Sequence, residues 1–473
     1  MAKVKDAHGK IKTEWTQNPG TRPAPKARTK GSDSQLISIR MPKEMMEKLR
    51  RVAQKKGNLA YQSLIKSYIS EGLLQTPSAK ETSPGTQSIQ KSAASSKIFK
   101  ETLARIGTPY LEPSQDRIAA PHQELSKHSV IAEDIENLAR FLSPYFQEFA
   151  GKRFLITGAF GFLGKYMVHL LKYLNEEVLT EKTSALLLDN FVTGYEQQVV
   201  LDKHLQFVRH DVIQPYDTDL DVDYIIHMAG IASPAYYTKY PIETMDVGTI
   251  GTRNMLELAA RKNVKSFLFT SSSEVYGDPD PGHVPTREDY HGNVSVNGPR
   301  SCYDESKRFG ETMVMAFHRV YNLPVKIVRP FNVYGPGIRP DDYRVLPNFI
   351  EHALRREPLP IHGEGKNTRS FCYINDAVEA IFRVLFSGAQ GEAFNVGNPG
   401  PEISVKELAV KVARAMPHPV DVIHIDPPHS VYATSDPKRR CPDITKLQTT
   451  TGFQPKYSLD KGLQRTICWF SER

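Results

Sequence analysis

The feature that most constrains the fold of this chain is a glycine pattern at residues 154–164, which read Phe-Leu-Ile-Thr-Gly-Ala-Phe-Gly-Phe-Leu-Gly. An apolar run that breaks into three glycines at three-residue spacing predicts a strand that turns into a helix. Gly158 permits the tight turn, Gly161 lets the backbone approach a pyrophosphate, and Gly164 lets the helix pack close to the strand. The helix N-terminus then points at the phosphates, so this stretch predicts a dinucleotide-binding turn.

An acidic residue ends the next predicted strand, at residues 184–189. A carboxylate at this place accepts a hydrogen bond from a ribose 2′-hydroxyl. Asp189 therefore favours NAD over NADP, because a 2′-phosphate would meet its negative charge and no arginine follows within several residues. The candidate cofactor-binding residues are Gly158, Phe160, Gly161, Phe162, Leu163, Gly164, Asp189, Asn190, Phe191, Thr193, Gly194, Asp211, Val212, Ala229, Tyr303 and Lys307.

Six apolar runs separated by helical or loop crossovers predict a parallel, doubly wound α/β sheet of the Rossmann type. A lead-in helix is expected at residues 134–149, before the first strand. Residues 131–473 are expected to form one large domain, with a dinucleotide part at about 152–328 and a smaller substrate part at about 329–473. The predicted strands are residues 154–157, 184–189, 206–209, 223–228, 266–270 and 325–328.

The N-terminal end carries the basic character of the chain. Residues 1–74 hold 16 Lys and Arg against 6 Asp and Glu, a surplus of 10 in a chain whose net charge is +8. This asymmetry favours a polyanionic partner for that end alone. Residues 1–33 are expected to be a disordered basic arm, and the Ser/Thr/Pro-rich residues 76–130 a linker.

Between the arm and the linker, residues 34–75 predict a short strand and two helices separated by a glycine turn. So small a unit buries too little surface to be stable alone, so it is expected to dimerise. The pattern resembles the ribbon-helix-helix family of DNA-binding domains. The resemblance implies that Leu36, Ser38 and Arg40 face a major groove from a two-stranded ribbon. The alternative is a dimerisation module that makes no DNA contact.

The cysteine usage and the hydropathy of the chain indicate the cellular compartment in which we expect the protein. The four cysteines include no Cys-x-x-Cys pair, so we expect neither a metal site nor a disulfide framework. The first 30 residues contain no apolar signal segment, and no run approaches 18 uncharged apolar residues. We therefore expect a cytoplasmic protein without membrane contact.

A tyrosine and a lysine lie four residues apart in the sequence Tyr303-Asp-Glu-Ser-Lys307, after the serine-rich run at 271–273. At this spacing both side chains share one face of a helix. A lysine ammonium beside a phenol favours the phenolate and lowers its pKa from about 10 toward neutrality. Tyr303 is therefore predicted to act as a general base.

Taken together, these motifs resemble the extended short-chain dehydrogenase/reductase superfamily over roughly residues 152–470. Finer motifs resemble its nucleotide-sugar branch, and within that branch the UDP-glucuronate decarboxylases. These motifs are Leu-Asp-Asn-Phe-Val-Thr-Gly at 188–194, Ser-Glu-Val-Tyr-Gly-Asp at 273–278, Arg-Ser-Cys-Tyr-Asp-Glu-Ser-Lys at 300–307, Arg-Pro-Phe-Asn-Val-Tyr-Gly-Pro at 329–336 and Lys-Arg-Arg-Cys-Pro-Asp-Ile at 438–444.

The resemblance implies a reaction in which NAD is consumed and regenerated in each turnover. Tyr303 takes the proton of the sugar 4-hydroxyl while C4 gives its hydride to NAD, and Ser272 binds the 4-oxygen. Glu274 and Arg440 handle decarboxylation and reprotonation at C5, and Lys307 also holds the nicotinamide ribose. The implied substrate-binding residues are Ser233, Pro234, Arg300, Asn332, Val345, Arg369 and Arg440, of which Asn332 and Arg369 grip the diphosphate.

Three departures from the family pattern leave the exact sugar and base open. Gly248 replaces a usual asparagine, Ser295-Val296 replaces Asn-Pro, and His362 replaces a tyrosine that packs by the nucleotide base. The alternative activities are a nucleotide-sugar 4-epimerase or 4,6-dehydratase, although Ser273 cannot supply the acid that dehydratases use. A non-catalytic NAD- or sugar-sensing regulator that binds DNA is a further alternative. A homodimer or a dimer of dimers is expected.

Overall fold

The computed structural model describes residues 3–5, 11–13, 129–193, 203–426 and 436–472. The chain divides into two compact units, Met1–Asp116 and Arg117–Arg473. The predicted ribbon-helix-helix segment, with Leu36, Ser38 and Arg40, lies outside the described residues, and so does Gly194.

Part of the N-terminal arm forms regular structure. Strands β1 (Lys3–Lys5) and β2 (Ile11–Thr13) pair antiparallel, with Val4 opposite Lys12. This differs from the expected disorder of residues 1–33. Both strands contain β-branched residues, which favour the extended backbone.

The second unit is built on a seven-stranded sheet in which every neighbouring pair is parallel, in the order β13-β8-β7-β6-β3-β4-β5. The order reverses between β3 and β6, and ligands of doubly wound sheets bind outside the carboxyl ends of the strands at such a point. This confirms the predicted Rossmann-type fold. The strands are β3 (Arg153–Thr157), β4 (Ser184–Asp189), β5 (Leu205–Arg209), β6 (Tyr224–His227), β7 (Ser266–Thr270), β8 (Val325–Pro330) and β13 (Glu392–Val396).

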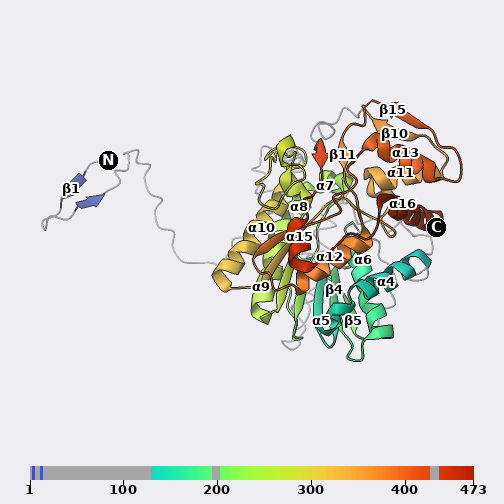
Figure 1. Cartoon of the computed structure of the whole chain (residues 1–473). Helices are drawn as coiled ribbons and strands as arrows, with labels where there is room; N and C mark the ends of the chain where they lie inside the picture. Colours follow the sequence, from blue (N-terminus) through green and yellow to red (C-terminus); the bar gives the residue numbers. More distant parts are fainter. Residues whose placement is uncertain (1–2, 6–10, 14–128, 194–202, 427–435, 473) are drawn as a thin grey trace, which may run out of the picture. The chain divides into compact units, whose positions relative to one another are not determined.

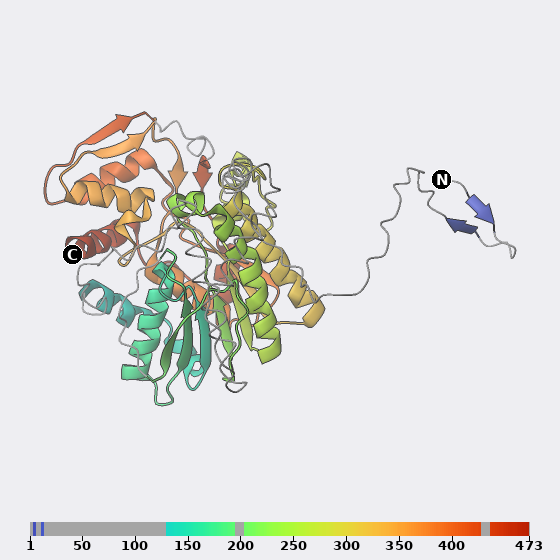
Figure 2. The same cartoon turned by 180° about the vertical axis from the view of Figure 1, so that it is seen from behind.

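Helices cover both faces of this sheet, as Figures 1 and 2 show from opposite sides. Successive residues of a strand point to opposite faces, so Leu155 packs with one helix layer and its neighbour Ile156 with the other. Helices α9 (Thr252–Lys262) and α10 (Ser301–Tyr321) form the first layer. The other layer contains α4 (Ser129–Phe141), α6 (Phe162–Tyr173) and α12 (Ile374–Phe386).

The predicted lead-in helix is divided. It begins earlier than expected, as α4, and continues after a turn as α5 (Phe146–Phe149). Pro144 lies in that turn, and a proline has no N–H to continue the helix and disfavours a helical residue before it.

A smaller part of the second unit follows β8 and contains several short sheets. Strand β13 lies between these elements in sequence, yet it returns to the edge of the main sheet beside β8. This strand was not predicted from the sequence. The short strands are β9 (Val333–Tyr334), β10 (Leu359–His362), β11 (Thr368–Arg369), β12 (Cys372–Tyr373), β14 (Ile403–Ser404), β15 (Val422–Ile425) and β16 (Arg439–Arg440). The remaining helices are α7 (Pro234–Lys239), α8 (Pro241–Asp246), α11 (Val345–Leu354), α13 (Val405–Ala415), α15 (Thr445–Thr451) and α16 (Leu459–Ser471).

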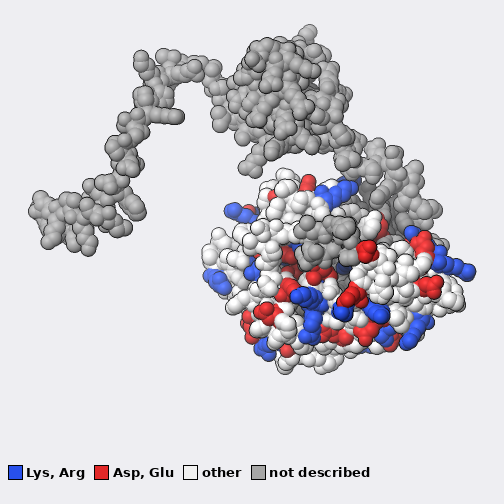
Figure 3. All heavy atoms as spheres, turned by 90° about the horizontal axis from the view of Figure 1, so that it is seen from above, with Lys and Arg blue, Asp and Glu red and all other residues white. Residues whose placement is uncertain are grey.

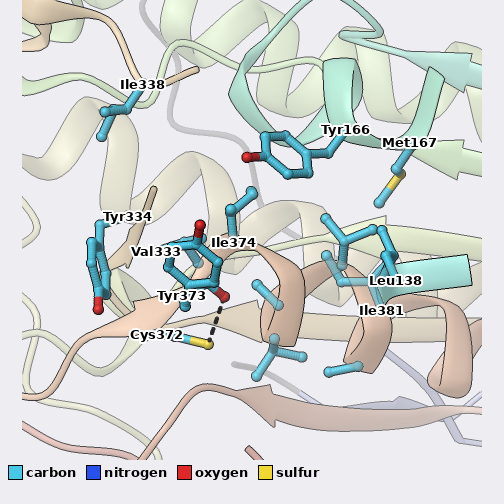
Figure 4. Packing of buried hydrophobic residues seen from close by; sticks show 14 of the residues in the cluster. Leu138, Tyr166, Met167, Val333, Tyr334, Ile338, Cys372, Tyr373, Ile374 and Ile381 are labelled. Carbon is cyan, nitrogen blue, oxygen red and sulfur yellow. Dashed lines mark hydrogen bonds between the residues drawn. The ribbon is translucent and has the colours of Figure 1, made fainter. Parts of the chain in front are cut away.

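A buried polar cluster joins the two parts within an otherwise apolar core. The carboxylate of Asp134 on α4 accepts hydrogen bonds from Tyr373 at 2.6 Å and Tyr166 at 3.2 Å, and it pairs with Arg465 of α16 at 2.8 Å. Figure 4 shows the two tyrosines among aliphatic side chains such as Ile374. Because all three donors come from elements far apart in sequence, Asp134 ties the lead-in helix to both parts.

The surface of the second unit carries both signs of charge. On the face drawn in Figure 3, Lys and Arg side chains are intermixed with Asp and Glu side chains. Within the described residues, no helix is long and apolar enough to cross a membrane.

Candidate active site

The glycine turn after β3 has the geometry that its sequence predicts. Gly158 has a φ of +67°, and a Cβ atom there would lie 2.9 Å from the backbone nitrogen of Ala229 at the end of β6. A Cβ at Gly164 would lie 2.4 Å from the carbonyl oxygen of Gly158, so α6 approaches the turn as closely as a glycine allows. Gly161 precedes the first residue of α6 and lines an open cavity. These residues fit a bound pyrophosphate.

Asp189 lies at the carboxyl end of β4 and faces the same cavity. Its two carboxylate oxygens accept backbone N–H groups of Phe160 and Phe191, each at 2.9 Å. These bonds hold the carboxylate at the rim, in position to accept a ribose hydroxyl. The sheet register places Arg209 of β5 directly beside Asp189, a neighbour that local sequence did not indicate.

The cavity runs along the carboxyl ends of the strands. Most of the predicted cofactor-binding residues line it, as does the predicted substrate residue Ser233. Those that line it are Gly158, Phe160, Gly161, Phe162, Asp189, Asn190, Thr193, Asp211, Val212 and Ala229. Leu163, Gly164, Phe191, Tyr303 and Lys307 are not among the lining residues.

Tyr303 and Lys307 lie on one face of α10, as predicted, and both are buried. The Tyr303 ring stacks on Tyr237 with 5.2 Å between ring centroids and 10° between planes. The phenol is hydrogen-bonded to Ser272, which follows the end of β7. Lys307 donates to the carbonyl oxygen of Thr270 at 2.8 Å. The structure therefore brings Ser272, Tyr303 and Lys307 together at the end of β7.

The protonation of this pair differs from the expectation. Burial raises the pKa of Tyr303 to about 12, although the hydrogen bond from Ser272 opposes this rise. The Lys307 ammonium lies 5.9 Å from the centroid of the tyrosine ring, and burial lowers its own pKa to about 8. In the protein's own groups the pKa of the phenol therefore lies above its ordinary value and not near neutrality, because desolvation outweighs the opposing effects of Ser272 and Arg344.

Glu274 lies between two buried arginines. Its carboxylate oxygens pair with Arg300 and Arg440, and Arg440 also donates to the carbonyl oxygen of Gly277 at 3.0 Å. Burial alone raises the pKa of Glu274, but the charges of Arg440 and Arg300 outweigh it and lower the pKa to about 2. Glu274 is therefore ionised at neutral pH. The Nε of Arg440 is buried and has no hydrogen-bond partner among the described residues.

Among the other predicted substrate residues, Arg369 and Asn332 lie near these arginines, whereas Pro234 and Val345 are not among the residues that line the cavity. Arg369 pairs with Asp436 at 2.7 Å, and the Asn332 amide donates to the carbonyl oxygen of Ser370 at 2.8 Å. Pro234 is the first residue of α7, and Val345 is the first residue of α11.

Arg339, Asp342 and Arg344, which were not predicted from the sequence, also line the cavity. Arg339 donates to the carbonyl oxygen of Thr193 and, at 2.7 Å, to the hydroxyl of Tyr236. Ser233 donates to the carbonyl oxygen of Asp342 at 2.8 Å. Arg344 pairs with Asp342, and its charge acts on Tyr303. In the sequence, the one signal for these residues is that Arg339 and Arg344 precede the predicted substrate residue Val345.

The departure at Gly248 has a packing explanation. Gly248 is buried in a π-helical turn, Val247–Gly251, and a Cβ there would lie 2.7 Å from the Cβ of Ser306 on α10. An asparagine does not fit at this position while Ser306 occupies the space. The other two departures are exposed: Val296 projects into solvent, and His362 ends β10.

Comparisons with known proteins agree with this geometry. Residues 154–397 match the NAD dependent epimerase/dehydratase family. UDP-glucuronic acid decarboxylase 2 of Arabidopsis thaliana is 42% identical over 326 residues, which are 68% of this chain and 69% of that protein.

Two solved structures extend the comparison. The UDP-glucose 4-epimerase of Thermotoga maritima, solved with UDP-glucose, has a TM-score of 0.59 and 26% identity over 68% of this chain and 99% of its own. MoeE5, solved in complex with UDP-glucuronic acid and NAD, has a TM-score of 0.55 and 26% identity over the same shares. The glycine turn, the acid-ended second strand and the Tyr303 to Lys307 pair thus lie in a chain that belongs to the NAD dependent epimerase/dehydratase family.

Proposed function

We propose that this chain decarboxylates UDP-glucuronate to UDP-xylose and keeps NAD as a cofactor that is regenerated in every turnover. The observation that carries this proposal is the pair of buried arginines, Arg300 and Arg440, which meet at Glu274, a residue whose charge also acts on Tyr303. A substrate carboxylate needs such cations, because an unpaired negative charge in a buried site is costly. The similarity to UDP-glucuronic acid decarboxylase 2 of Arabidopsis thaliana supports the choice of substrate.

The glycine turn, Asp189 and the strand ends would hold NAD. When bound, NAD accepts a hydride from the sugar and later returns it. Tyr303 would take the proton of the 4-hydroxyl, and Ser272 would hold the same oxygen through its hydroxyl. Lys307, fixed by the carbonyl oxygen of Thr270, keeps a positive charge behind the phenol. A phenol with a pKa of about 12 is protonated at neutral pH, so Tyr303 can take the sugar proton only after it has released its own to solvent. The positive charge that NAD brings when bound would favour this phenolate.

A ketone at C4 makes the C5 carboxylate able to leave as carbon dioxide. The enolate that results is stabilised by nearby positive charge, which Arg440 and Arg300 supply. Glu274 holds both guanidiniums in place and remains ionised. The unpartnered Nε of Arg440 offers a donor for a substrate oxygen. These contacts support a role for Arg440 and Glu274 in decarboxylation. An ionised Glu274 has no proton to give, so it could reprotonate C5 only after it first takes up a proton from water.

The deciding experiment incubates the purified protein with a panel of nucleotide sugars. We expect carbon dioxide and UDP-xylose from UDP-glucuronate. Protein that is purified with NAD bound should need no further NAD in the assay. Denaturation should release NAD in preference to NADP. Turnover of UDP-glucose or dTDP-glucose, with none of UDP-glucuronate, would instead indicate a 4-epimerase or a 4,6-dehydratase.

We further infer that the chain forms a homodimer or a dimer of dimers through α8 and α10. Their outer faces expose large apolar side chains, including Ile242, Phe309, Val320 and Tyr321. Exposed apolar surface on adjacent helices favours association. Light scattering should give at least a dimer for the wild type at micromolar concentration. A monomer for the wild type would contradict this inference.

We also propose that the protein is cytoplasmic, which its cysteine usage supports.

We further propose that residues 1–74 bind DNA as a ribbon-helix-helix unit. The basic surplus of that end supports this proposal. Full-length protein should shift a duplex at low salt, and Arg40→Ala should weaken the shift without changing sugar turnover. Absence of any shift, including with DNA upstream of its own gene, would leave the N-terminal unit as an assembly device.

A further inference from the structure

The arginines that are expected to bind the anionic substrate already hold carboxylates of the protein itself. Arg300, Arg369 and Arg440 are each less than 10% exposed. Their partners differ in exposure: the Glu274 side chain is 18% exposed and that of Asp436 is 38% exposed. A substrate that brings further negative charge therefore meets a cluster whose positive charges are already paired.

Asp436 has the geometry of a bound anion rather than of a surface ion pair. One oxygen accepts from Nη2 of Arg369 at 2.7 Å and from the Asn367 amide at 3.3 Å, and the other accepts from Nη1 of Arg300 at 3.4 Å. Three donors from two separate segments, β11 with the residue before it and the start of α10, thus converge on one carboxylate. Arg369 also donates to the carbonyl oxygens of Thr368 and Lys438.

Arg369 depends on this carboxylate for charge compensation. Burial lowers the pKa of Arg369, and the nearby charges of Arg440 and Arg300 act in the same direction, while Asp436 and, more weakly, Glu274 oppose them. A guanidinium in such surroundings binds strongly to any anion that presents oxygens in its plane, and a diphosphate does so.

We propose that Asp436 is an internal anion that occupies the place of the substrate diphosphate and is displaced from Arg369 when a nucleotide diphosphate binds. The inference rests on the proposed function, because it takes the diphosphate of a nucleotide sugar as the competing anion. Two anions cannot share one guanidinium fork without strong repulsion at this separation. Asp436 is the more exposed of the two carboxylates, so moving it from its ion pair into water costs less free energy than moving Glu274 would. Glu274 therefore stays between Arg300 and Arg440.

The experiment measures binding of UDP, which has the diphosphate but no sugar to react, by calorimetry to the full-length protein. Asp436→Asn keeps the size of the side chain and removes the competing charge. We expect UDP to bind the variant about three- to fivefold more tightly than the wild type, the equivalent of one partly exposed ion pair. Inorganic pyrophosphate should show the same gain, because the anion and not the base is the competitor.

Two control variants separate displacement from a general charge effect. Asp436→Glu retains the carboxylate and should not tighten binding. Glu402→Gln removes a nearby carboxylate on which the charge of Arg369 also acts but which pairs with Arg439 at 2.7 Å, and it should tighten UDP binding much less than Asp436→Asn does. A gain in Glu402→Gln equal to that in Asp436→Asn would mean that net charge alone is responsible, and it would overturn the proposal.

The remaining outcomes are also decisive. Weaker or unchanged UDP binding in Asp436→Asn, with a melting temperature near that of the wild type, would mean that Asp436 only orients Arg369 and would overturn the proposal. Failure of every variant to bind UDP and pyrophosphate would overturn it as well. Release of carbon dioxide from UDP-glucuronate by the wild type tests the proposed function separately. If UDP binds Asp436→Asn more tightly but no carbon dioxide is released, the displacement of Asp436 is supported and the decarboxylase activity is refuted.

Discussion

Two alanine substitutions in the glycine turn should affect different properties, Gly164→Ala the stability of the fold and Gly161→Ala the binding of the cofactor. A methyl group at Gly164 would lie 2.4 Å from the carbonyl oxygen of Gly158 and 2.5 Å from that of Ala159. Both are backbone atoms of the turn and cannot rotate away. Overpacking of this kind costs about 3 kcal/mol, and the better helix propensity of alanine returns about 1 kcal/mol. Gly164→Ala should therefore lower the free energy of unfolding by about 2 kcal/mol.

Gly161→Ala should leave the fold nearly unchanged. Gly161 has φ of −70° and ψ of 177°, which alanine adopts freely, and its added methyl group would meet only the carbonyl oxygen of Gly158, at 3.2 Å. The change in unfolding free energy should stay within about 1 kcal/mol. The methyl group would enter the cavity where a pyrophosphate approaches. Loss of one charge-assisted N–H bond weakens NAD binding about 10- to 100-fold.

The assays are urea unfolding and the amount of nucleotide released on denaturing the purified protein. Gly164→Ala with wild-type stability would refute the close-packing explanation. Gly161→Ala that retains one NAD per chain would refute the pyrophosphate explanation. The two glycines are three residues apart, so each variant serves as the control for the other.

Three further predictions test the site and the core. Tyr303→Phe should lower turnover about 100-fold or more while UDP binding persists, because the general base is lost; turnover near the wild-type rate would remove Tyr303 from the mechanism. Arg440→Lys should slow carbon dioxide release about tenfold or more, since a point charge replaces a fork of donors, and an unchanged rate would contradict this role. Burial raises the pKa of Asp134 to about 6 from its ordinary 3.8, against the opposing effect of Arg465, so its contribution to stability is present below pH 4 and is lost as the pH rises through 6. Over this pH range the free energy of unfolding of the wild type should fall by up to about 3 kcal/mol, and that of Asp134→Asn should not show this fall. Parallel pH profiles for the two proteins would contradict the shifted pKa.

The local sequence was sufficient to predict the fold class and much of the site. The glycine spacing, the acid at the end of β4 and the Tyr303 to Lys307 interval are properties of a few consecutive residues. Backbone sterics and helix periodicity act over that same range, so the turn after β3 and the shared face of α10 follow from sequence. Five of the six predicted strands lie within one residue of their observed limits at each end, and the sixth, β8, extends two residues further.

The tertiary structure decided what depends on burial and on pairing across the chain. The sheet register places Arg209 beside Asp189, and β13 returns to the main sheet after more than 60 residues of other elements. Desolvation inside the folded domain sets the pKa of Tyr303 to about 12, a value that no interval in the sequence indicates. The contact of Asp436 with Arg369 arises in the same way: the two side chains are 67 residues apart, and only the packed backbone brings them to 2.7 Å. Periodicity predicts which face a side chain occupies, whereas its partners and its dielectric surroundings exist only once the chain is folded.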